Sequence, residues 1–336
     1  MLVDGRSYRS LWLDRDGRTV RIIDQRWLPH ELWVVGLNTL DEAIDAIAEG
    51  RVRGGPLTAA VAAYGIAFAM FENPSNLSLM RACGRLAHVT AASAEAGWVL
   101  REMNRDLLFR QPWQRREAAY VRALDLCETD VANRRRIGEH GVTILKQMSI
   151  QRQGRPLKVL ALSSAGWLSA VDWGSAFAPI YSGREAGIPM HVLLDSGLDQ
   201  RSSAALIRWE LAGQGLSHST ISTETGPDLM REGLVDLVFL DAQSVSLQGD
   251  VRNLEPASQW VEHASAHGIP CYAAATFAAI GWGDLAEHDD AVPLLNQIGS
   301  DVTMSQHLTG LITERGICRP ARDALGLLFP DRIEAA

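Results

Sequence analysis

The stretch "KVLALSSAGWLSA" (158–170) has the pattern of a buried strand that ends in a turn of small residues and continues as a helix. In α/β proteins, ligands bind at such strand ends. This turn offers only Ser163, Ser164, Ala165 and Gly166, and a serine hydroxyl is a weak nucleophile without a partner base. No G-x-S-x-G elbow surrounds Ser163, so its hydroxyl could contact a ligand or satisfy a backbone group.

A second polar turn, 241–253, follows the apolar run "VDLVFLD". It begins at Asp241 and contains the tripeptide "QGD", in which Asp250 could bind a ligand hydroxyl or stabilise the turn through an Asx-type bond. The histidines show no i, i+4 pair and the cysteines no CxxC pair, so the sequence predicts neither a metal site nor a disulfide framework.

The second half of the chain alternates between strand and helix patterns. Short apolar runs predict buried strands at 157–163, 190–196, 218–223, 235–241 and 270–276. Amphipathic stretches between them predict helices, for example at 202–215 and 256–268. Such alternation is typical of a parallel sheet covered by helices on both faces, which would bring the two polar turns to one edge.

The first half predicts a small β region followed by helices. Residues 8–27 alternate about Asp16-Gly17, which favours a hairpin, and a capping-box pattern starts a helix at Thr39 that ends at Gly50. Further helices are predicted at 57–70, 76–109, 112–131 and 133–152. The polar turn Gln153–Pro156 separates the halves, so we expect domains of residues 1–153 and 154–336.

The composition excludes several classes of protein. The chain has 336 residues, 47% of them hydrophobic, and a net charge of −8, which argues against nucleic-acid binding through a basic face. The apolar stretch 57–70 is too short and alanine-rich to span a bilayer, and the N-terminus lacks the apolar core of a signal peptide. With four scattered cysteines, we expect a cytoplasmic protein that does not act at a membrane.

Several motifs, in order along nearly the whole chain, resemble the methylthioribose-1-phosphate isomerase family, which is related to the regulatory subunits of translation initiation factor two-B. "IIDQRWLPHEL" is similar to the family's IDQxxLPxEL, and "VRGGPLTAAVAAYGIAFA" resembles its VRGAPAIGxAAAYGxALA. "RIGEHGVTIL", "WEL", "QGDVRN" and "DVTMSQHLTGLITERGI" continue the match. The hairpin expected at the start of the chain and "IGEHG" favour the isomerase branch over the initiation-factor branch.

The resemblance implies a helical N-terminal domain, a Rossmann-like C-terminal domain, an active-site cleft between them and a homodimer that needs no cofactor. It also implies conversion of an aldose 1-phosphate to a ketose 1-phosphate, with a sugar-like small molecule as partner. The family uses a cysteine and an aspartate in an apolar pocket to assist ring opening and to move hydrogen between C1 and C2. Arginines, a lysine and backbone amides hold the phosphate.

Both catalytic positions of the family carry other residues here. Its H-C-N-x-G motif falls on "LSSAG", which places Ser163 on the cysteine and retains Gly166. Its G-A-D-R motif falls on "DAQS", which places Gln243, an amide that exchanges no proton near neutral pH, on the aspartate. Asp241 lies two positions earlier and could point the same way along a strand, or be an ordinary strand-end carboxylate. Ser163, Gln243 and Asp241 are therefore the candidate catalytic positions.

Only part of the family's anion-binding residues is retained in this sequence. Arg53, Gly54 and Gly55 of "VRGGP" remain and could bind an anion through a guanidinium and backbone amides. In a second motif, Thr90 replaces an arginine and Glu95 replaces an asparagine. A phosphate dianion needs several donors to offset its desolvation, and one arginine is too few.

Further substrate-binding candidates lie in the second half. Gly166, Gln248, Gly249, Asp250 and Asn253 match the family, whereas its lysine is Leu254 here and its glutamine falls on Ser202, with Gln200 and Arg201 close by. Because the losses are confined to the site while the scaffold motifs survive, we interpret them as a changed site.

Three functions remain open. The first is a divergent isomerase that acts on an altered, less phosphate-dependent sugar or sugar-like metabolite. The second is the family's ordinary reaction, with Asp241 or a water in place of the missing groups. The third is a non-catalytic ligand-binding or regulatory dimer with the fold of initiation factor two-B.

Overall fold

The computed structural model describes residues 1–333 apart from positions 4, 92, 164–165, 198–202, 254–255 and 283–300. Two compact units emerge from its internal contacts. Unit 1 comprises Met1–Ser7, Asn133–Trp167 and Trp173–Ala336, and unit 2 comprises Tyr8–Ala132 and Leu168–Asp172. The division falls inside helix α5 (Arg115–Gln151), so it lies about five and a half helical turns before the predicted boundary at residue 153.

Helix α5 corrects one prediction from the sequence. It is a single helix of 37 residues where two helices, 112–131 and 133–152, were expected. No glycine or proline occurs between Arg115 and Ile137, so nothing in the backbone chemistry interrupts the helix there.

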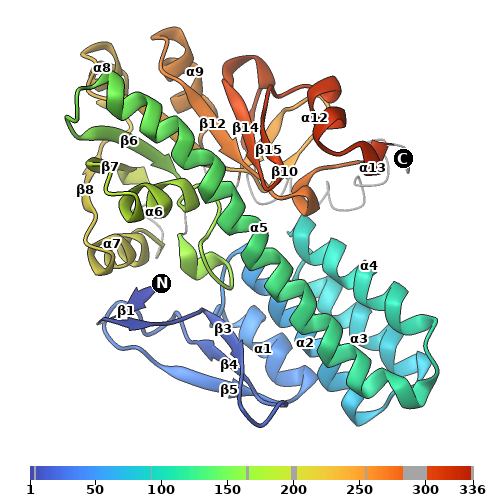
Figure 1. The fold of residues 1–336 in the computed structure, drawn as a ribbon. Helices are drawn as coiled ribbons and strands as arrows, with labels where there is room; N and C mark the ends of the chain where they lie inside the picture. Colours follow the sequence, from blue (N-terminus) through green and yellow to red (C-terminus); the bar gives the residue numbers. More distant parts are fainter. Residues whose placement is uncertain are drawn as a thin grey trace. The chain divides into compact units, whose positions relative to one another are not determined.

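Unit 2 combines a small sheet with a group of helices (Figure 1). Its elements are β3 (Leu11–Leu13), β4 (Val20–Ile23), β5 (Val34–Leu37), α1 (Leu40–Ala48), α2 (Gly55–Glu72), α3 (Asn76–Val89), α4 (Ala94–Leu108), a 3₁₀ turn (Pro112–Gln114) and the first part of α5. The predicted hairpin is confirmed, because Leu13 pairs with Val20 across Asp16-Gly17. A third strand, β5, pairs with β4 and was not predicted.

The helix starts in unit 2 follow local capping chemistry. Thr39 and Glu42 form the predicted capping box of α1. The single helix expected at 76–109 is wrong, because α3 ends at Val89 and Ser93 caps α4 by accepting a hydrogen bond from the Ala96 amide. The helical pattern is therefore interrupted between Val89 and Ala94.

Helix α2 forms the core of unit 2. Its mean hydropathy of 1.3 and its length would suit a membrane span, but 72% of the helix is buried inside the protein. Gly54 precedes it as N-cap with φ of +96°, and no side chain caps the helix start. Burial on most of its faces explains why α2 lacks the polar stripe of a surface helix.

Unit 1 is built on a seven-stranded sheet in the order β15-β14-β12-β9-β6-β7-β8. The strands are β6 (Leu157–Leu162), β7 (Met190–Asp195), β8 (Ser217–Ile221), β9 (Leu237–Asp241), β12 (Cys271–Ala274), β14 (Gly310–Thr313) and β15 (Gly316–Cys318). All neighbours are parallel except β14 and β15. The five predicted strands are confirmed, and β14 and β15 complete the sheet.

The remaining elements of unit 1 surround this sheet. They are β1 (Leu2–Val3), β2 (Arg6–Ser7), α6 (Ala178–Glu185), α7 (Ser203–Gly213), α8 (Gly226–Arg231), β10 (Ser244–Val245), β11 (Val251–Asn253), α9 (Ser258–Ala266), β13 (Asp301–Thr303), α12 (Arg322–Leu328), α13 (Pro330–Ile333) and three 3₁₀ turns (Trp167–Ser169, which ends in unit 2, Phe277–Ala279 and Ser305–His307). Strands β10, β11 and β13 form a separate antiparallel sheet.

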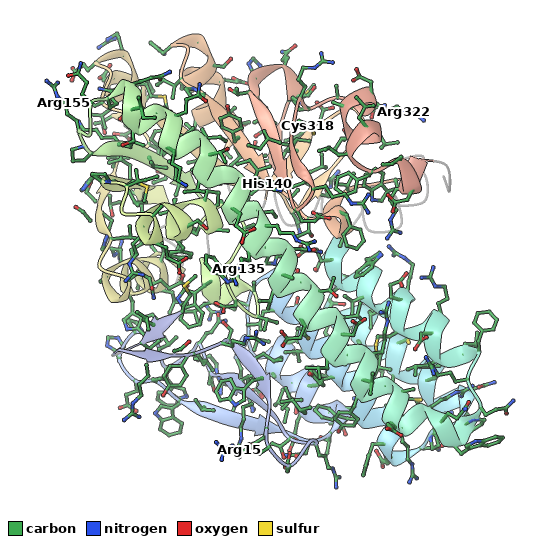
Figure 2. The ribbon with its side chains drawn as sticks, viewed as in Figure 1. Arg15, Arg135, His140, Arg155, Cys318 and Arg322 are labelled. Atoms are coloured by element: carbon green, nitrogen blue, oxygen red, sulfur yellow. The ribbon has the colours of Figure 1, made fainter. Side chains whose placement is uncertain are left out.

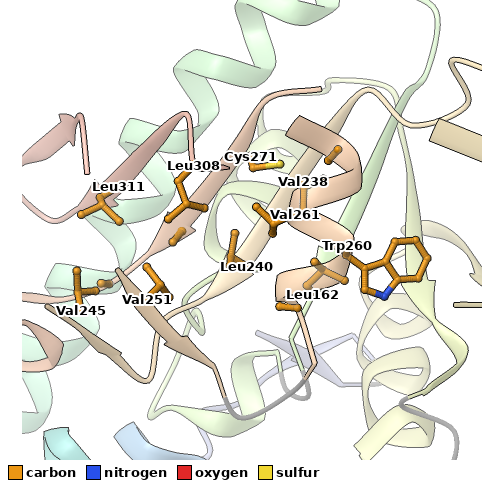
Figure 3. Close-up of a cluster of buried hydrophobic side chains, with 14 of the residues drawn as sticks. Leu162, Val238, Leu240, Val245, Val251, Trp260, Val261, Cys271, Leu308 and Leu311 are labelled. Atoms are coloured by element: carbon orange, nitrogen blue, oxygen red, sulfur yellow. The ribbon is translucent and has the colours of Figure 1, made fainter. Parts of the chain in front are cut away.

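A hydrophobic core fixes the ends of β6 and β9 (Figure 3). Leu162 and Leu240 are buried in this core and pair with each other in register. Ser163, the first residue after β6, and Asp241, the last residue of β9, therefore lie side by side at the carboxyl edge of the sheet, since parallel strands lie about 4.8 Å apart.

Candidate active site

Ser163 and Asp241 meet at the carboxyl edge of the sheet in unit 1. The Ser163 hydroxyl donates a hydrogen bond to Asp241 Oδ2. Ser163 is buried, while Asp241 is half-buried. The structure thus brings together two of the three predicted catalytic positions, one a hydroxyl and the other a carboxyl.

Two further groups bind the Asp241 carboxyl. The amide of Ala176 donates to Oδ1 at 2.6 Å, and Ser175 also hydrogen-bonds the carboxyl. Burial raises the pKa of Asp241, although the hydrogen bonds from Ser163, Ala176 and Ser175 and the charge of Arg134 pull it down. A carboxyl in this setting is suited to proton transfer closer to neutral pH than an exposed aspartate.

Arg134 and Ser175 belong to this site, and sequence reasoning missed both. Arg134 lies on α5, has no exposed surface, and donates a hydrogen bond from Nη1 to Ser175 Oγ. It is the first of three consecutive arginines, and nothing in their residue types says which one points inward. Only the helical phase of α5 against the sheet decides this.

Glu314 is a buried acid at the same edge of the sheet. It follows β14, and the amide of Phe277 donates to both of its carboxylate oxygens, at 3.3 Å and 3.2 Å. Burial raises the pKa of Glu314, and the charges of Arg315 and Arg134 oppose that rise. The sequence showed Glu314 only inside the long motif near the C-terminus, so its burial at the strand end was not predicted.

Gly166 has a packing role in this region. A Cβ at this position would lie 1.9 Å from Glu210 Oε2, which is buried and accepts hydrogen bonds from the Trp167 amide at 2.8 Å and from the Tyr181 hydroxyl at 2.9 Å. The close approach of Glu210 therefore requires glycine. Substrate binding by Gly166 stays a prediction.

Gln243 lies in the turn between β9 and β10. Its backbone N–H donates to the Arg252 carbonyl at 2.9 Å, and the residue is half-buried. The side chain carries no titratable group, so of the candidates at 241 and 243 only Asp241 can exchange a proton near neutral pH.

Gln248, Gly249 and Asp250 form the hairpin between β10 and β11. Gln248 is exposed, and Gly249 has φ of +89°, with the Pro320 carbonyl oxygen 2.2 Å from the position of a Cβ. Asp250 Oδ1 accepts a hydrogen bond from the Ser305 amide at 2.8 Å. The conformation of the hairpin explains why residue 249 is glycine, and the Ser305 amide explains the position of Asp250 Oδ1. Ligand contacts of these residues stay predictions.

Asn253 is buried on β11. Its Nδ2 donates to Thr303 Oγ1 at 2.8 Å, and its Oδ1 has no hydrogen-bond partner in the part of the chain that the structure describes. The positions Ser164, Gln200, Arg201, Ser202 and Leu254, which also featured in the sequence comparison, lie outside the described residues.

In unit 2, Arg53, Gly54 and Gly55 stand at the start of α2. Arg53 is half-buried, and its Nε donates to the Gly50 carbonyl at 3.3 Å. A Cβ on Gly55 would lie 3.0 Å from Ser93 Oγ and 3.1 Å from Glu95 Oε2. An acidic side chain therefore stands beside the glycine pair, which disfavours an anion at this helix start.

The cysteines of unit 1 do not replace a thiol at the sheet edge. Cys271 begins β12, at the opposite edge, and Cys318 pairs with Leu311 near the start of β14. Burial raises the pKa of Cys271 to about 12 and that of Cys318 to about 11, so both are protonated thiols at neutral pH. Among the described residues, no group of three or more His, Cys, Asp or Glu side chains is placed to hold a metal ion.

No protein-family model matches the chain. Curated relatives match it over its whole length. It is 37% identical over 366 aligned residues to a methylthioribose-1-phosphate isomerase of Cereibacter sphaeroides (strain KD131 / KCTC 12085), with 100% of both chains covered. It is 36% identical over 366 residues to the protein of the same name from Sinorhizobium medicae (strain WSM419), covering 99% of this chain and 100% of the relative.

Solved structures share the fold. A 5-methylthioribose 1-phosphate isomerase from Pyrococcus horikoshii OT3 aligns with a TM-score of 0.80 and 22% identity over 97% of each chain. The delta subunit of translation initiation factor eIF-2B from A. fulgidus aligns with a TM-score of 0.76 and 26% identity over 96% of this chain and 100% of the other. These likenesses confirm the predicted α/β fold class.

Proposed function

The chain belongs to the methylthioribose-1-phosphate isomerase family, and we propose that it catalyses an aldose-to-ketose isomerisation of a sugar or sugar-like metabolite. The relatives support an isomerase-like function. One observation carries the proposal: the Ser163 hydroxyl binds the Asp241 carboxyl at the carboxyl edge of the parallel sheet. Ligands of open α/β sheets bind at that edge.

In the proposed reaction, Asp241 transfers the proton. Its carboxylate accepts the proton on C2 of the open aldose, which leaves an enediol, and then returns a proton to C1. The hydroxyl proton on O2 moves to O1, so the product is the ketose isomer and no redox partner is needed. Ser163 donates a hydrogen bond that orients the carboxylate.

The proposed substrate depends less on phosphate than the substrate named for the relatives. Arg53 is the cation retained in the motif before α2, and Glu95 places a carboxylate beside Gly55. A dianion at this helix start would meet the Glu95 charge, whereas a sugar hydroxyl could donate to it. In the proposal, Gln248, Asp250 and Asn253 of unit 1 contact polar groups of the sugar, and Arg53, Gly54 and Gly55 are the substrate-binding candidates of unit 2.

A substrate panel tests this proposal. Purified protein is incubated with 5-methylthioribose 1-phosphate, ribose 1-phosphate and free ribose in D₂O, and ¹H NMR follows the ketose product and deuterium at C1. We expect turnover of a less phosphorylated sugar, and loss of that turnover in Arg53→Ala but not in Arg15→Ala, whose side chain is exposed at the hairpin turn. Full activity on 5-methylthioribose 1-phosphate alone would contradict the altered substrate.

A non-catalytic ligand-binding or regulatory role is the second candidate. The structural likeness to an eIF-2B delta subunit supports it. This role predicts ligand-dependent thermal stabilisation without product for any sugar. We also propose that the protein is a cytoplasmic homodimer, which sedimentation velocity tests independently of activity.

A further inference from the structure

One arginine of unit 1 is buried where an ordinary surface arginine would be expected. Arg134 has no exposed surface, whereas its neighbours Arg135 and Arg136 are exposed. Arg135, which is labelled in Figure 2, pairs with the exposed Glu139 at 3.3 Å. Burying a guanidinium costs several kcal/mol unless hydrogen bonds and opposite charge offset the loss of water. The partners of Arg134 therefore indicate its role.

Those partners lead to the candidate active site. Arg134 Nη1 donates to Ser175 Oγ, and Ser175 in turn hydrogen-bonds the Asp241 carboxyl. The chain of contacts thus runs from α5, through the loop before α6, to the end of β9. Serine can accept from the guanidinium and donate to the carboxylate at the same time, so both bonds fix the orientation of one hydroxyl.

We propose that Arg134 is a positioning residue for the Ser163–Asp241 pair, because its buried guanidinium holds Ser175 so that the carboxylate keeps both its orientation and a compensating positive charge. This inference rests on the proposed function, in which Asp241 transfers the proton. Arg134 itself does not touch the substrate in this scheme. It acts through Ser175 and through its charge.

The charges around the pair make this role necessary. The charge of Arg134 acts on Asp241 and also on Glu314, on which the charge of Arg315 acts as well. Burial favours the protonated form of Asp241, and a protonated carboxyl cannot accept the proton from C2. The charge of Arg134 offsets that effect in part, which makes the ionised form of Asp241 available at lower pH.

An NMR titration of carboxyl carbons tests the inference without a substrate. Protein labelled with ¹³C at aspartate Cγ is titrated, and the Asp241 signal is assigned by its loss in Asp241→Asn. We expect Arg134→Gln to raise the titration midpoint of Asp241 by about one pH unit or more. Arg136→Gln, an exposed arginine two positions along the same helix, should leave the midpoint unchanged. An unchanged midpoint in Arg134→Gln would overturn the proposal.

Activity gives a second readout. The acid limb of the pH–rate profile should move upward by the same interval in Arg134→Gln and stay in place in Arg136→Gln. A shifted midpoint with no turnover of any sugar would reject the proposed function and keep the positioning role. If Arg134→Gln does not fold, circular dichroism of Arg134→Gln/Asp241→Asn decides: recovered folding supports the inference, and continued unfolding overturns it.

Discussion

The carboxyl edge of the sheet in unit 1 and the glycine turn before α2 in unit 2 preserve their geometry by opposite means. At the sheet edge, side chains define the site, since Ser163, Asp241 and Arg134 bind one another directly or through Ser175. At the turn, the absence of a side chain is decisive, because Gly54 leaves no room for a Cβ beside Ser169. Single substitutions can therefore change the chemistry of the sheet edge. At Gly54, in contrast, any side chain would collide with Ser169.

The largest expected effect falls on the sheet edge. Asp241→Asn keeps the size of the side chain but removes the exchangeable proton, so we expect kcat/KM to fall by about 10²–10⁴-fold. Asp323→Asn, an exposed aspartate of the same unit, should leave the rate unchanged. A rate for Asp241→Asn within tenfold of the wild type would mean that another group transfers the proton. The sheet edge would then not be the catalytic region of the molecule.

The next effect falls on the turn and concerns stability. In Gly54→Ala, the new Cβ would lie 2.5 Å from Ser169 Cβ and 2.6 Å from its carbonyl oxygen, at a backbone φ of +96°. We expect a loss of about 2–3 kcal/mol in the free energy of unfolding, measured with urea.

Gly84→Ala provides the matched control for the turn. Gly84 is exposed on α3, and a Cβ there would meet no atom within 4 Å. Alanine should stabilise this helix by about 0.5–1 kcal/mol. If both alanine variants changed stability in the same direction, the steric account of the turn would be wrong.

The two regions also differ in how well the sequence predicted them. Gly54 and Gly249 were predicted as ligand-binding positions, and those roles stay predictions. The positive φ of both residues gives a backbone reason for glycine there. The strands β6 and β9 were predicted from short apolar runs, and their shared register makes Ser163 and Asp241 neighbours. The alternation of side chains along a strand was enough to propose that Asp241 points toward the site.

Arg134 and Glu314 could not be found in the same way. Their importance comes from burial and from partners that are distant in sequence: Ser175 lies 41 residues from Arg134. An arginine in a run of three, or a glutamate before another arginine, looks like an ordinary surface charge. The rotation of α5 about its axis and the order of the strands bring these charged side chains into the site. Both depend on how the whole chain packs, so local residue patterns do not reveal them.

A smaller effect distinguishes one acid of each unit by how its contribution to the free energy of unfolding changes with pH. The pKa of Asp241 is raised above its ordinary value of 3.8 in the folded protein, chiefly by burial. Its contribution to stability is therefore complete below about pH 4 and is lost as pH rises through the folded pKa. Urea unfolding should show Asp241→Asn gaining on the wild type as pH rises through this window.

Asp24 of unit 2 should show the opposite sign. Burial opposes ionisation there, but the hydrogen bonds and charge of Arg26, with Arg26 Nη2 2.7 Å from Asp24 Oδ2, lower the pKa overall. Its stabilising contribution is present above the unfolded pKa and is lost as pH falls through the folded pKa. Asp24→Asn should therefore cost most at neutral pH and least in acid, and parallel curves for the two variants would refute the contrast.

The smallest expected effect distinguishes an orienting hydroxyl from a nucleophile. Ser163→Ala removes one donor from a carboxyl that keeps the Ala176 amide and Ser175, so we expect a loss of about 1 kcal/mol in stability and less than tenfold in kcat/KM. Loss of a nucleophile would instead abolish turnover at every pH. Because Ser163 donates to the carboxyl, its removal should also raise the pKa of Asp241, and a rate loss that recovers at higher pH would identify the hydroxyl as an orienting group.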